Sequence, residues 1–268
     1  MNQKPVIGII GIGMVGGALK RYFDASGYPV VQYDPPKGFA DAAVFNSAQF
    51  IFISVPTPYD EEKGGFDLSF VEAAFKLIPD GKIVVIKSTV LPGTTQEFQT
   101  KYPKLKVLFN PEFLTEETAD QDMKFPDRQI VGYTEQSFTV AGDLIQILPL
   151  SPFERMMSST EAEMVKYFGN TWFAVKVVFA NQMYDVCQKL GIDYDTVRDG
   201  ASADKRIGRS HLQVMHKGYR GYGGKCLPKD TRALIQLGDR MGLSLDLLKT
   251  AEAINNKLVQ QTSLDSDR

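Results

Sequence analysis

A glycine-rich turn close to the N-terminus limits the folds open to this 268-residue chain more than any other segment. Gly11–Gly16 has the spacing G-x-G-x-x-G, follows the apolar run Pro5–Ile10 and opens the helix-like segment Met14–Ser26. The next apolar run, Val30–Tyr33, ends at Asp34. A strand, this turn, a helix and a second strand with an acidic end form the βαβ unit that binds dinucleotides.

Each glycine of the turn has its own predicted role. Gly11 allows the tight bend, Gly13 lets the backbone approach a pyrophosphate, and Gly16 lets helix and strand pack closely. The first helical residues, Met14 and Val15, then present N–H groups and the positive end of the helix dipole to the phosphates.

The acidic residue after the second strand indicates which cofactor the unit binds. Asp34 is placed to accept hydrogen bonds from a ribose diol and to repel a 2′-phosphate. The sequence therefore predicts NAD rather than NADP. The alternative interpretation is a glycine-rich turn that binds no ligand.

Strand-like and helix-like segments alternate through the first half of the chain, which predicts the α/β class with a doubly wound parallel sheet. The run from Phe50 to Val55 is nearly all apolar, as expected for a strand buried on both faces. The other expected strands are Lys82–Ile86, Lys106–Phe109 and Gln129–Val131, and the expected helices are Leu68–Ile78 and Thr94–Thr100.

The pattern changes after about residue 156. Ser159–Leu190 contains no proline and carries apolar residues at three- and four-residue steps, which indicates one long helix with Glu161 and Glu163 in an acidic first turn. Tyr194–Ala201 and Pro228–Val259 are also helical in pattern. We therefore predict a Rossmann domain, residues 1–156, followed by an all-helical dimerisation domain, residues 157–268, with a short tail from Thr262 onwards.

Composition excludes several kinds of protein. The net charge of −2 gives no basic surface for nucleic acid or an anionic membrane. Two cysteines and two histidines form neither a disulfide framework nor a metal-binding cluster, so we expect no metal. No run reaches the ~20 apolar residues of a membrane span. We expect a cytoplasmic protein with reduced thiols.

A second glycine-rich segment, Gly221–Asp230, carries a cysteine. Cys226 lies between Lys225 and Lys229, just before a proline that suits a first helical turn. The helix dipole and the two cations would stabilise a thiolate, which predicts a nucleophile. The alternative is a small buried apolar residue, and that interpretation fits Cys187 inside the long helix.

Two polar residues lie on one face of the long helix. Lys166 and Asn170 are four residues apart, and apolar residues follow them on the same face. A covered lysine and asparagine need polar partners, which favours a functional pair. The alternative is a solvated polar patch.

Taken together, these motifs resemble those of the UDP-glucose 6-dehydrogenase/GDP-mannose dehydrogenase family. The resemblance implies an NAD-dependent enzyme that oxidises the C6 alcohol of a nucleotide sugar to a carboxylate in a four-electron reaction, within polysaccharide biosynthesis. The similar segments, in chain order, are Gly11–Gly16, Ser54–Pro58, Lys87–Val90, Asn110–Leu114 with Glu116, Pro126–Arg128, Glu161–Asn170, Asp204–Gly208 and Gly221–Asp230.

The resemblance also implies roles for the catalytic residues. Cys226 would attack an aldehyde intermediate to give a thiohemiacetal and then a thioester, which water hydrolyses. Lys166 and Asn170 would stabilise the oxyanions, and Asp230 would act with Lys166 in proton transfer around a bound water. Glu112 would help to activate water at the thioester step.

Further residues are assigned through the same resemblance. Thr89 and Glu116 would lie near the nicotinamide and the water network, although Glu112 and Glu116 alone also fit an acidic pair at a helix start. Other contacts to NAD would come from Val55, Pro56, Thr57 and Lys229. The sugar would be held by Glu112, Phe113, Leu114, Lys166, Asn170, Tyr222, Gly223 and Gly224. Arg206 would reach the site of a neighbouring subunit, which implies a homodimer.

Several alternatives remain open at this level. Family members continue into a C-terminal UDP-binding domain, which we expect to be absent from these 268 residues. UDP-glucose is the first candidate substrate, with GDP-mannose or a UDP-N-acetylhexosamine as alternatives. A hydroxyacid dehydrogenase and a non-catalytic NAD-binding dimer module that needs a partner are the competing protein classes.

Overall fold

The computed structural model describes residues 3–63 and 65–266, which divide into two compact units. The first unit consists of residues 1–58 and 66–166, and the second of residues 59–65 and 167–268. The division falls inside the long helix, farther along the chain than the change of sequence pattern at residue 156. Each unit is described by itself below.

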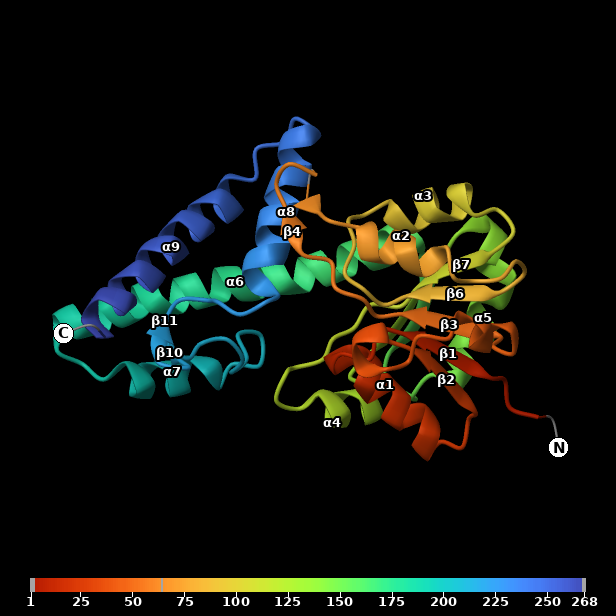
Figure 1. Cartoon of the computed structure of the whole chain (residues 1–268). Coiled ribbons are helices and arrows are strands. Elements are labelled where there is room, and N and C mark those ends of the chain that lie inside the picture. Colours follow the sequence, from red (N-terminus) through yellow and green to blue (C-terminus); the bar gives the residue numbers. More distant parts are fainter. Residues whose placement is uncertain (1–2, 64, 267–268) are drawn as a thin grey trace. The chain divides into compact units, whose positions relative to one another are not determined.

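The first unit is built on a seven-stranded sheet with the strand order β2-β1-β3-β6-β7-β8-β9 (Figure 1). This order, with β1 inside and the chain winding outwards in both directions, is that of a doubly wound sheet, and the glycine-rich turn after β1 is typical of the Rossmann type. The strands are β1 (Ile7–Ile10), β2 (Val30–Tyr33), β3 (Phe50–Ile53), β6 (Ile83–Ile86), β7 (Lys106–Phe109), β8 (Gln129–Tyr133) and β9 (Glu154–Ser158).

Apolar side chains alternate between the two faces of this sheet. Phe50 and Phe52 join one core cluster, whereas Ile51 and Ile53 join the other. Helices α1 (Met14–Ala25), α4 (Ala119–Lys124) and α5 (Phe138–Ile147) supply side chains to the first cluster. Helices α2 (Ser69–Phe75) and α3 (Thr94–Lys101) supply the second, together with the start of α6 (Ser159–Leu190). Burial on both faces explains why the central strands contain almost no polar residues.

The sheet is not wholly parallel, so that expectation is corrected. The pairs β1–β2, β1–β3, β3–β6, β6–β7 and β8–β9 are parallel, but β7 and β8 are antiparallel. Two parallel neighbouring strands need a crossover connection that returns the chain to the end of the sheet where the first strand began. Residues 110–128 contain only the short α4, which packs against α1, and β8 therefore runs back beside β7.

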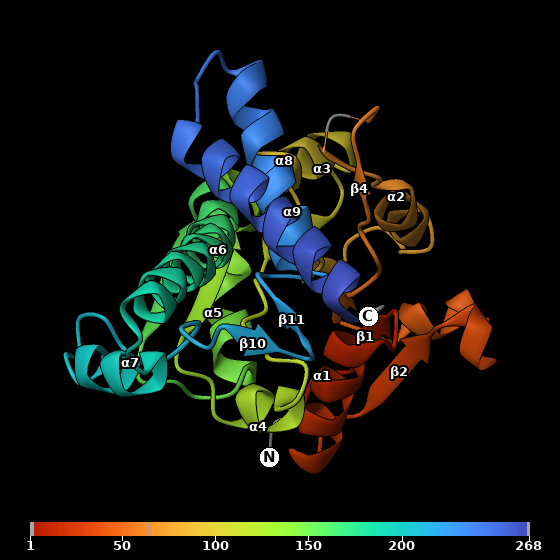
Figure 2. The same ribbon diagram turned by 90° about the vertical axis from the view of Figure 1, so that its left-hand side faces the viewer.

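The second unit is mainly helical, but it is not all-helical as expected. Besides α6 it contains α7 (Tyr194–Ser202), α8 (Leu227–Arg240) and α9 (Asp246–Ser266). A hairpin of β10 (Met215–His216) and β11 (Tyr219–Arg220) lies between α7 and α9 (Figure 2), and β4 (Tyr59–Asp60) pairs with β5 (Gly65–Phe66). The hairpin forms around Gly218, whose φ of +86° suits a tight turn.

The C-terminal helical stretch also differs from its prediction. It is interrupted between α8 and α9, where Gly242 has a φ of +72° that ends a helix. Helix α9 continues to Ser266, so the prediction of a tail is wrong from Thr262 to Ser266. Residues 267–268 of the expected tail lie outside the described residues.

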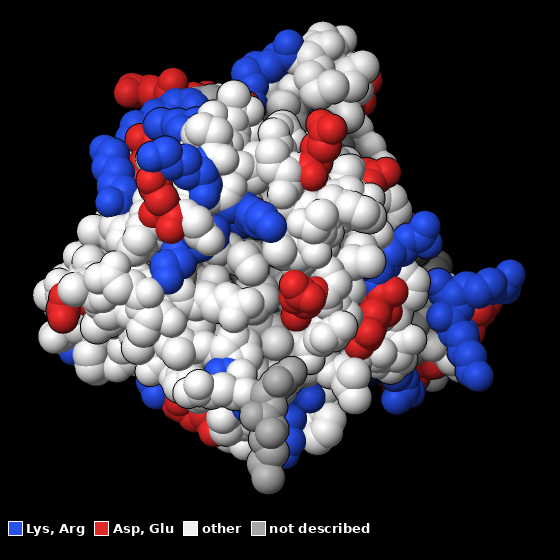
Figure 3. Space-filling view, turned by 90° about the vertical axis from the view of Figure 1, so that its right-hand side faces the viewer, with Lys and Arg blue, Asp and Glu red and all other residues white. Residues whose placement is uncertain are grey.

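Charge and hydropathy of the folded chain add two observations. Acidic and basic side chains both occur on the face in Figure 3, separated by wide uncharged areas. None of the helices in residues 3–63 and 65–266 has the length and apolarity that a membrane crossing needs.

Candidate active site

In the glycine-rich turn between β1 and α1, two glycines leave no space for a side chain, and the third borders free space. Gly11 has a φ of +87°, and a Cβ there would lie 2.7 Å from the Ser54 carbonyl oxygen. A Cβ at Gly16 would overlap the Gly11 carbonyl oxygen. A Cβ at Gly13 would meet nothing within 4 Å. The turn therefore keeps free space beside Gly13, where a pyrophosphate would approach the backbone.

Asp34 is held against this turn. Its Oδ2 atom accepts a hydrogen bond of 2.8 Å from the Ile12 N–H, and Lys37 donates to the Ile12 carbonyl. Helix α1 begins after Gly13 without a side-chain cap, which leaves its first N–H groups directed at the free space. A carboxylate, open space and helix N–H groups at the end of β1 fit the ribose and pyrophosphate of NAD.

This geometry predicts different outcomes for two alanine variants. Gly13 has an extended backbone that alanine adopts readily, so Gly13→Ala should keep the free energy of unfolding within about 1 kcal/mol. The new methyl group fills the space for the pyrophosphate and should weaken NAD binding at least ~10-fold. Gly16→Ala should lose both stability and NAD binding, because overpacking lowers the free energy of unfolding by about 1–3 kcal/mol. Calorimetric titration with NAD and thermal unfolding measure both effects, and equal behaviour of the two variants would contradict this account.

Two loops at the carboxyl ends of β3 and β6 are joined by side-chain hydrogen bonds. Thr57 Oγ1 donates to the Thr89 carbonyl at 2.7 Å, and Ser88 Oγ donates to the Val55 carbonyl at 2.7 Å. Thr57 is buried, Thr89 and Val55 are half-buried, and Pro56 is exposed. These loops lie at the edge of the sheet where ligands bind in this fold.

A buried ion pair follows β7. Lys166 Nζ lies 2.6 Å from Glu112 Oε1 and 2.7 Å from the Glu112 carbonyl, and the two residues are 6% and 8% exposed. Burial raises the pKa of Glu112, but the Lys166 ammonium and the hydrogen bonds from Lys166 and the Leu114 N–H outweigh this, so the pKa lies below its ordinary value. Glu112 is therefore a carboxylate at neutral pH.

Lys87 is a second buried cation in this region, and the sequence analysis gave it no role. Its Nζ donates to Asn110 Oδ1 at 2.7 Å, and Asn110 Nδ2 donates to the Ile130 carbonyl at 2.8 Å. Burial lowers the pKa of Lys87 to about 8; the Glu112 carboxylate opposes this shift and the Lys166 ammonium adds to it. The chain of bonds fixes the end of β7, from which the loop with Glu112 starts.

The remaining predicted residues of this loop differ in their surroundings. The guanidinium carbon of Arg128 lies 3.9 Å from the centre of the Phe113 ring, and Lys166 Nζ lies 5.8 Å from it. Phe113 and Leu114 are half-buried, whereas Glu116 is exposed. Arg128, known only as part of a motif from the sequence, therefore supports the ring that is predicted to contact the sugar.

Glu163 was predicted as part of an acidic helix start but is fully buried. Its carboxylate accepts hydrogen bonds from the Thr95 N–H at 2.8 Å and the Thr95 hydroxyl at 2.6 Å, and from the Gly93 N–H at 2.6 Å. It thus caps α3 and joins the start of α6 to the loop after β6. Burial raises the pKa of Glu163 to about 7, although these hydrogen bonds oppose the shift.

Glu163 should make stability depend on pH in a defined direction. Its pKa is about 7 in the folded chain against an ordinary value of 4.5, so the folded chain binds more protons between these values and the contribution of Glu163 to stability falls as pH rises. The free energy of unfolding of the protein minus that of Glu163→Gln should fall by about 3 kcal/mol across this window. Exposed Glu161 has a pKa below its ordinary value. Above pH 5 the free energy of unfolding of Glu161→Gln should therefore change with pH in the same way as that of the unchanged chain. Denaturant titrations at several pH values test this, and parallel curves for Glu163→Gln would contradict it.

The second unit brings two of the predicted residues, Asn170 and Lys229, to Asp230. This aspartate is fully buried, and Asn170 Nδ2 and Lys229 Nζ both donate to its carboxylate, the latter at 2.7 Å. Asn170 is buried on α6, as the sequence analysis expected. Two donors hold the carboxylate in one orientation.

Cys226 is the N-cap of α8 and is exposed, whereas Cys187 is buried. The Cys226 carbonyl accepts a hydrogen bond of 2.9 Å from the Asp230 N–H. The candidate nucleophile and the buried Asp230 carboxylate therefore belong to one helical turn. Gly224, two residues earlier, has a φ of +72° that suits glycine. An exposed thiol at a helix N-terminus has the surroundings of a reactive cysteine.

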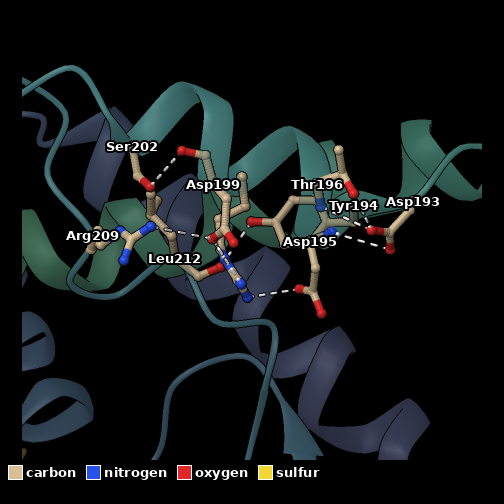
Figure 4. A network of polar contacts seen from close by, with 9 residues as sticks. Asp193, Tyr194, Asp195, Thr196, Asp199, Ser202, Arg209 and Leu212 are labelled. Carbon is tan, nitrogen blue, oxygen red and sulfur yellow. Dashed lines mark hydrogen bonds and ion pairs between the residues drawn. The ribbon is translucent and has the colours of Figure 1, made fainter.

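Arg206, predicted to reach a neighbouring subunit, has a side chain that is 90% exposed and pairs with Asp204 at 2.6 Å. The preceding helix α7 is fixed by a polar network (Figure 4), in which Asp193 caps the helix by accepting from the Thr196 N–H and hydroxyl. Arg209 lies 4.0 Å from Asp199 of the same network. The arginine therefore extends from a well-supported segment into solvent.

The predicted residues are thus collected into one group in each unit. The NAD-binding turn and the Glu112–Lys166 pair belong to the first unit, and the Asn170–Asp230 pair with Cys226 belongs to the second. Comparison with known families matches a large part of each unit. The NAD binding domain of the UDP-glucose/GDP-mannose dehydrogenase family matches residues 39–146, and the central domain of that family matches residues 160–257.

The chain belongs to the UDP-glucose/GDP-mannose dehydrogenase family. A UDP-glucose 6-dehydrogenase of Pseudomonas aeruginosa is 38% identical over 239 residues, which are 82% of this chain and 49% of that protein. The solved structure of a UDP-glucose dehydrogenase from Pyrobaculum islandicum is similar with a TM-score of 0.83 and 29% identity, covering 95% of this chain and 68% of that one. The first unit is accordingly an NAD-binding domain.

Two further comparisons concern the length of the match and the fold. The chain spans about half the length of the curated relatives it matches. A 3-hydroxyisobutyrate dehydrogenase of Mycobacterium tuberculosis is similar with a TM-score of 0.74 and covers 95% of this chain and 93% of that one. At 14% identity this likeness concerns the fold alone.

Proposed function

We propose that this family member oxidises the C6 alcohol of a nucleotide sugar, UDP-glucose foremost, to the carboxylate with NAD as the oxidant. The observation that carries the proposal is the exposed Cys226 at the start of α8, one helical turn from the buried Asn170–Asp230 pair. A scaffold that only binds NAD has no physical need for a thiol in these surroundings. The names of the relatives support UDP-glucose as the first candidate.

In the first oxidation, the C6 alcohol loses a hydride and its hydroxyl proton and becomes an aldehyde. Bound NAD supplies the hydride acceptor in both oxidations, so two NADH form for each sugar. In this proposal Lys166 and Asn170 stabilise the alkoxide, and Lys166 and Asp230 serve in the transfer of the hydroxyl proton through a bound water to solvent. Thr57, Thr89 and Lys229 contact the cofactor in this proposal.

The second oxidation runs through a covalent intermediate. The Cys226 thiol loses its proton and its sulfur forms a bond to C6 of the aldehyde, while the carbonyl oxygen takes up that proton and becomes the hydroxyl of a thiohemiacetal. Loss of a second hydride and of the hydroxyl proton gives a thioester. Water, activated near Glu112, then breaks the carbon–sulfur bond and releases the uronic acid and the thiol.

The proposal includes a homodimer formed by the second unit. Large apolar side chains are exposed along one side of α6, among them Phe168 at 72% and Trp172 at 54%. A contiguous apolar stripe of this kind is typical of a surface that a second protein covers. Arg206 would then contribute to the site of the other subunit. A cytoplasmic location belongs to the proposal on the basis of cysteine usage.

A substrate panel tests the function directly. The purified chain is incubated with NAD and, separately, UDP-glucose, GDP-mannose, UDP-N-acetylhexosamines and small 2-hydroxy and 3-hydroxy acids, and NADH is followed by absorbance. We expect the fastest turnover with UDP-glucose. Turnover of a hydroxy acid alone would favour the other dehydrogenase class, and NAD binding without any turnover would favour a non-catalytic module.

A further inference from the structure

We propose that Asn255 is the positioning residue of the nucleophile loop, residues 221–226, an inference that rests on the proposed function. Asn255 lies on α9, 33 residues beyond Tyr222. Its Oδ1 atom accepts a hydrogen bond of 2.6 Å from the Tyr222 N–H, and its Nδ2 atom donates to the Tyr222 carbonyl at 2.9 Å. One side chain thus satisfies both backbone groups of the second residue of the loop.

Both partners of this clamp are shielded from water. Asn255 and Tyr222 are each 4% exposed, so the backbone groups of Tyr222 need a protein partner. The Tyr222 side chain also packs with Ala174 and Val178 of α6, one and two turns beyond Asn170. The clamp therefore fixes the Tyr222 backbone to α9, while the Tyr222 side chain packs against the helix that carries Asn170.

The loop itself accommodates the clamp through a glycine. Gly221 has a φ of +86°, and a Cβ at this position would lie 2.5 Å from Asn255 Oδ1. A side chain at Gly221 would displace the amide from Tyr222. The glycine that opens the loop is thus required by Asn255, which the sequence analysis did not consider.

The segment between the clamp and the nucleophile is intrinsically flexible. Gly223 and Gly224 follow Tyr222, and fixing the backbone of a glycine opposes folding more than fixing that of any other residue. At its other end the loop enters α8, where the Cys226 carbonyl accepts from the Asp230 N–H. Asn255 holds the near end, so that Cys226 keeps its place one helical turn before Asp230 ahead of substrate binding.

Asn255→Leu removes both hydrogen bonds and keeps the branching at Cγ, and Asn256→Leu is the matched control, because Asn256 is the next residue of α9 and is exposed. We expect Asn255→Leu to lower kcat roughly 10- to 100-fold, as for a misplacement of about 1 Å, with the KM for NAD unchanged. Deuterium exchange of the peptide that contains residues 221–226 should accelerate at least ~10-fold. Asn256→Leu should change neither quantity.

Asn255→Asp provides a milder variant, because it retains the acceptor for the Tyr222 N–H and loses only the donor to the carbonyl. We expect an intermediate kcat and intermediate exchange. Faster exchange with an unchanged kcat would overturn the positioning role, and unchanged exchange in Asn255→Leu would overturn the clamp. If no nucleotide sugar is turned over by the unchanged chain, the proposed function fails, but deuterium exchange still tests the clamp. The rate of Cys226 alkylation by iodoacetamide then replaces kcat as the second measurement. An unaltered alkylation rate in Asn255→Leu would contradict the proposal.

Discussion

Cys226→Ala should lower steady-state NADH formation from UDP-glucose by at least about 1,000-fold. In the proposed mechanism the thiol forms the covalent bond through which the second oxidation proceeds, and alanine offers no nucleophile in its place. The first oxidation does not need the thiol, so a single turnover should release at most one NADH for each sugar bound. Rapid mixing with NADH absorbance measures both quantities.

The second cysteine gives the matched control. Cys187 is buried in α6 beside Tyr194 and Leu212, and Cys187→Ala should keep turnover while lowering stability by about 1 kcal/mol for the small cavity. Unchanged turnover in Cys226→Ala would sink the covalent mechanism. Equal losses in both cysteine variants would point to folding rather than chemistry.

Lys166→Met should abolish turnover and also destabilise the first unit strongly. Removing the ammonium leaves the Glu112 carboxylate buried without its partner at 2.6 Å. An uncompensated buried charge of this kind reduces stability by about 3–5 kcal/mol. Thermal and denaturant unfolding measure this loss, while NADH formation measures the catalytic one.

A double variant separates these two effects. Lys166→Met combined with Glu112→Leu replaces the ion pair by apolar side chains of similar volume, which should recover most of the lost stability. Turnover should stay at the level of the single variant, because the group that we propose to stabilise the alkoxide is still missing. Recovery of turnover together with stability would show that Lys166 acts only in folding.

Local patterns made much of the first unit predictable. The order strand, Gly11–Gly16, helix, Asp34 is contained within 30 residues, and the close approach of Gly16 to the Gly11 carbonyl follows from the turn itself. The strand at Phe50 was recognisable because burial on both faces leaves an uninterrupted apolar run. Cys226 at the start of α8 followed from the proline and glycines around it.

Contacts between distant segments were not predictable in the same way. The reversal of β8 depends on how residues 110–128 pack, and no periodic pattern encodes it. Glu163 has the signature of an exposed helix start, yet the N-terminus of α3 lies against it and makes it a buried cap. Asn255 lies in an ordinary helical pattern, and only the fold brings it to Tyr222.

The central claim is a four-electron oxidation of a nucleotide sugar by this chain. Its most direct test is the ratio of NADH to uronic acid when the purified protein is incubated with NAD and UDP-glucose, with the product identified by mass spectrometry. The account predicts two NADH for each UDP-glucuronate, with a transient adduct on Cys226. One NADH for each sugar with an aldehyde as the final product, or no NADH with any nucleotide sugar, would contradict it.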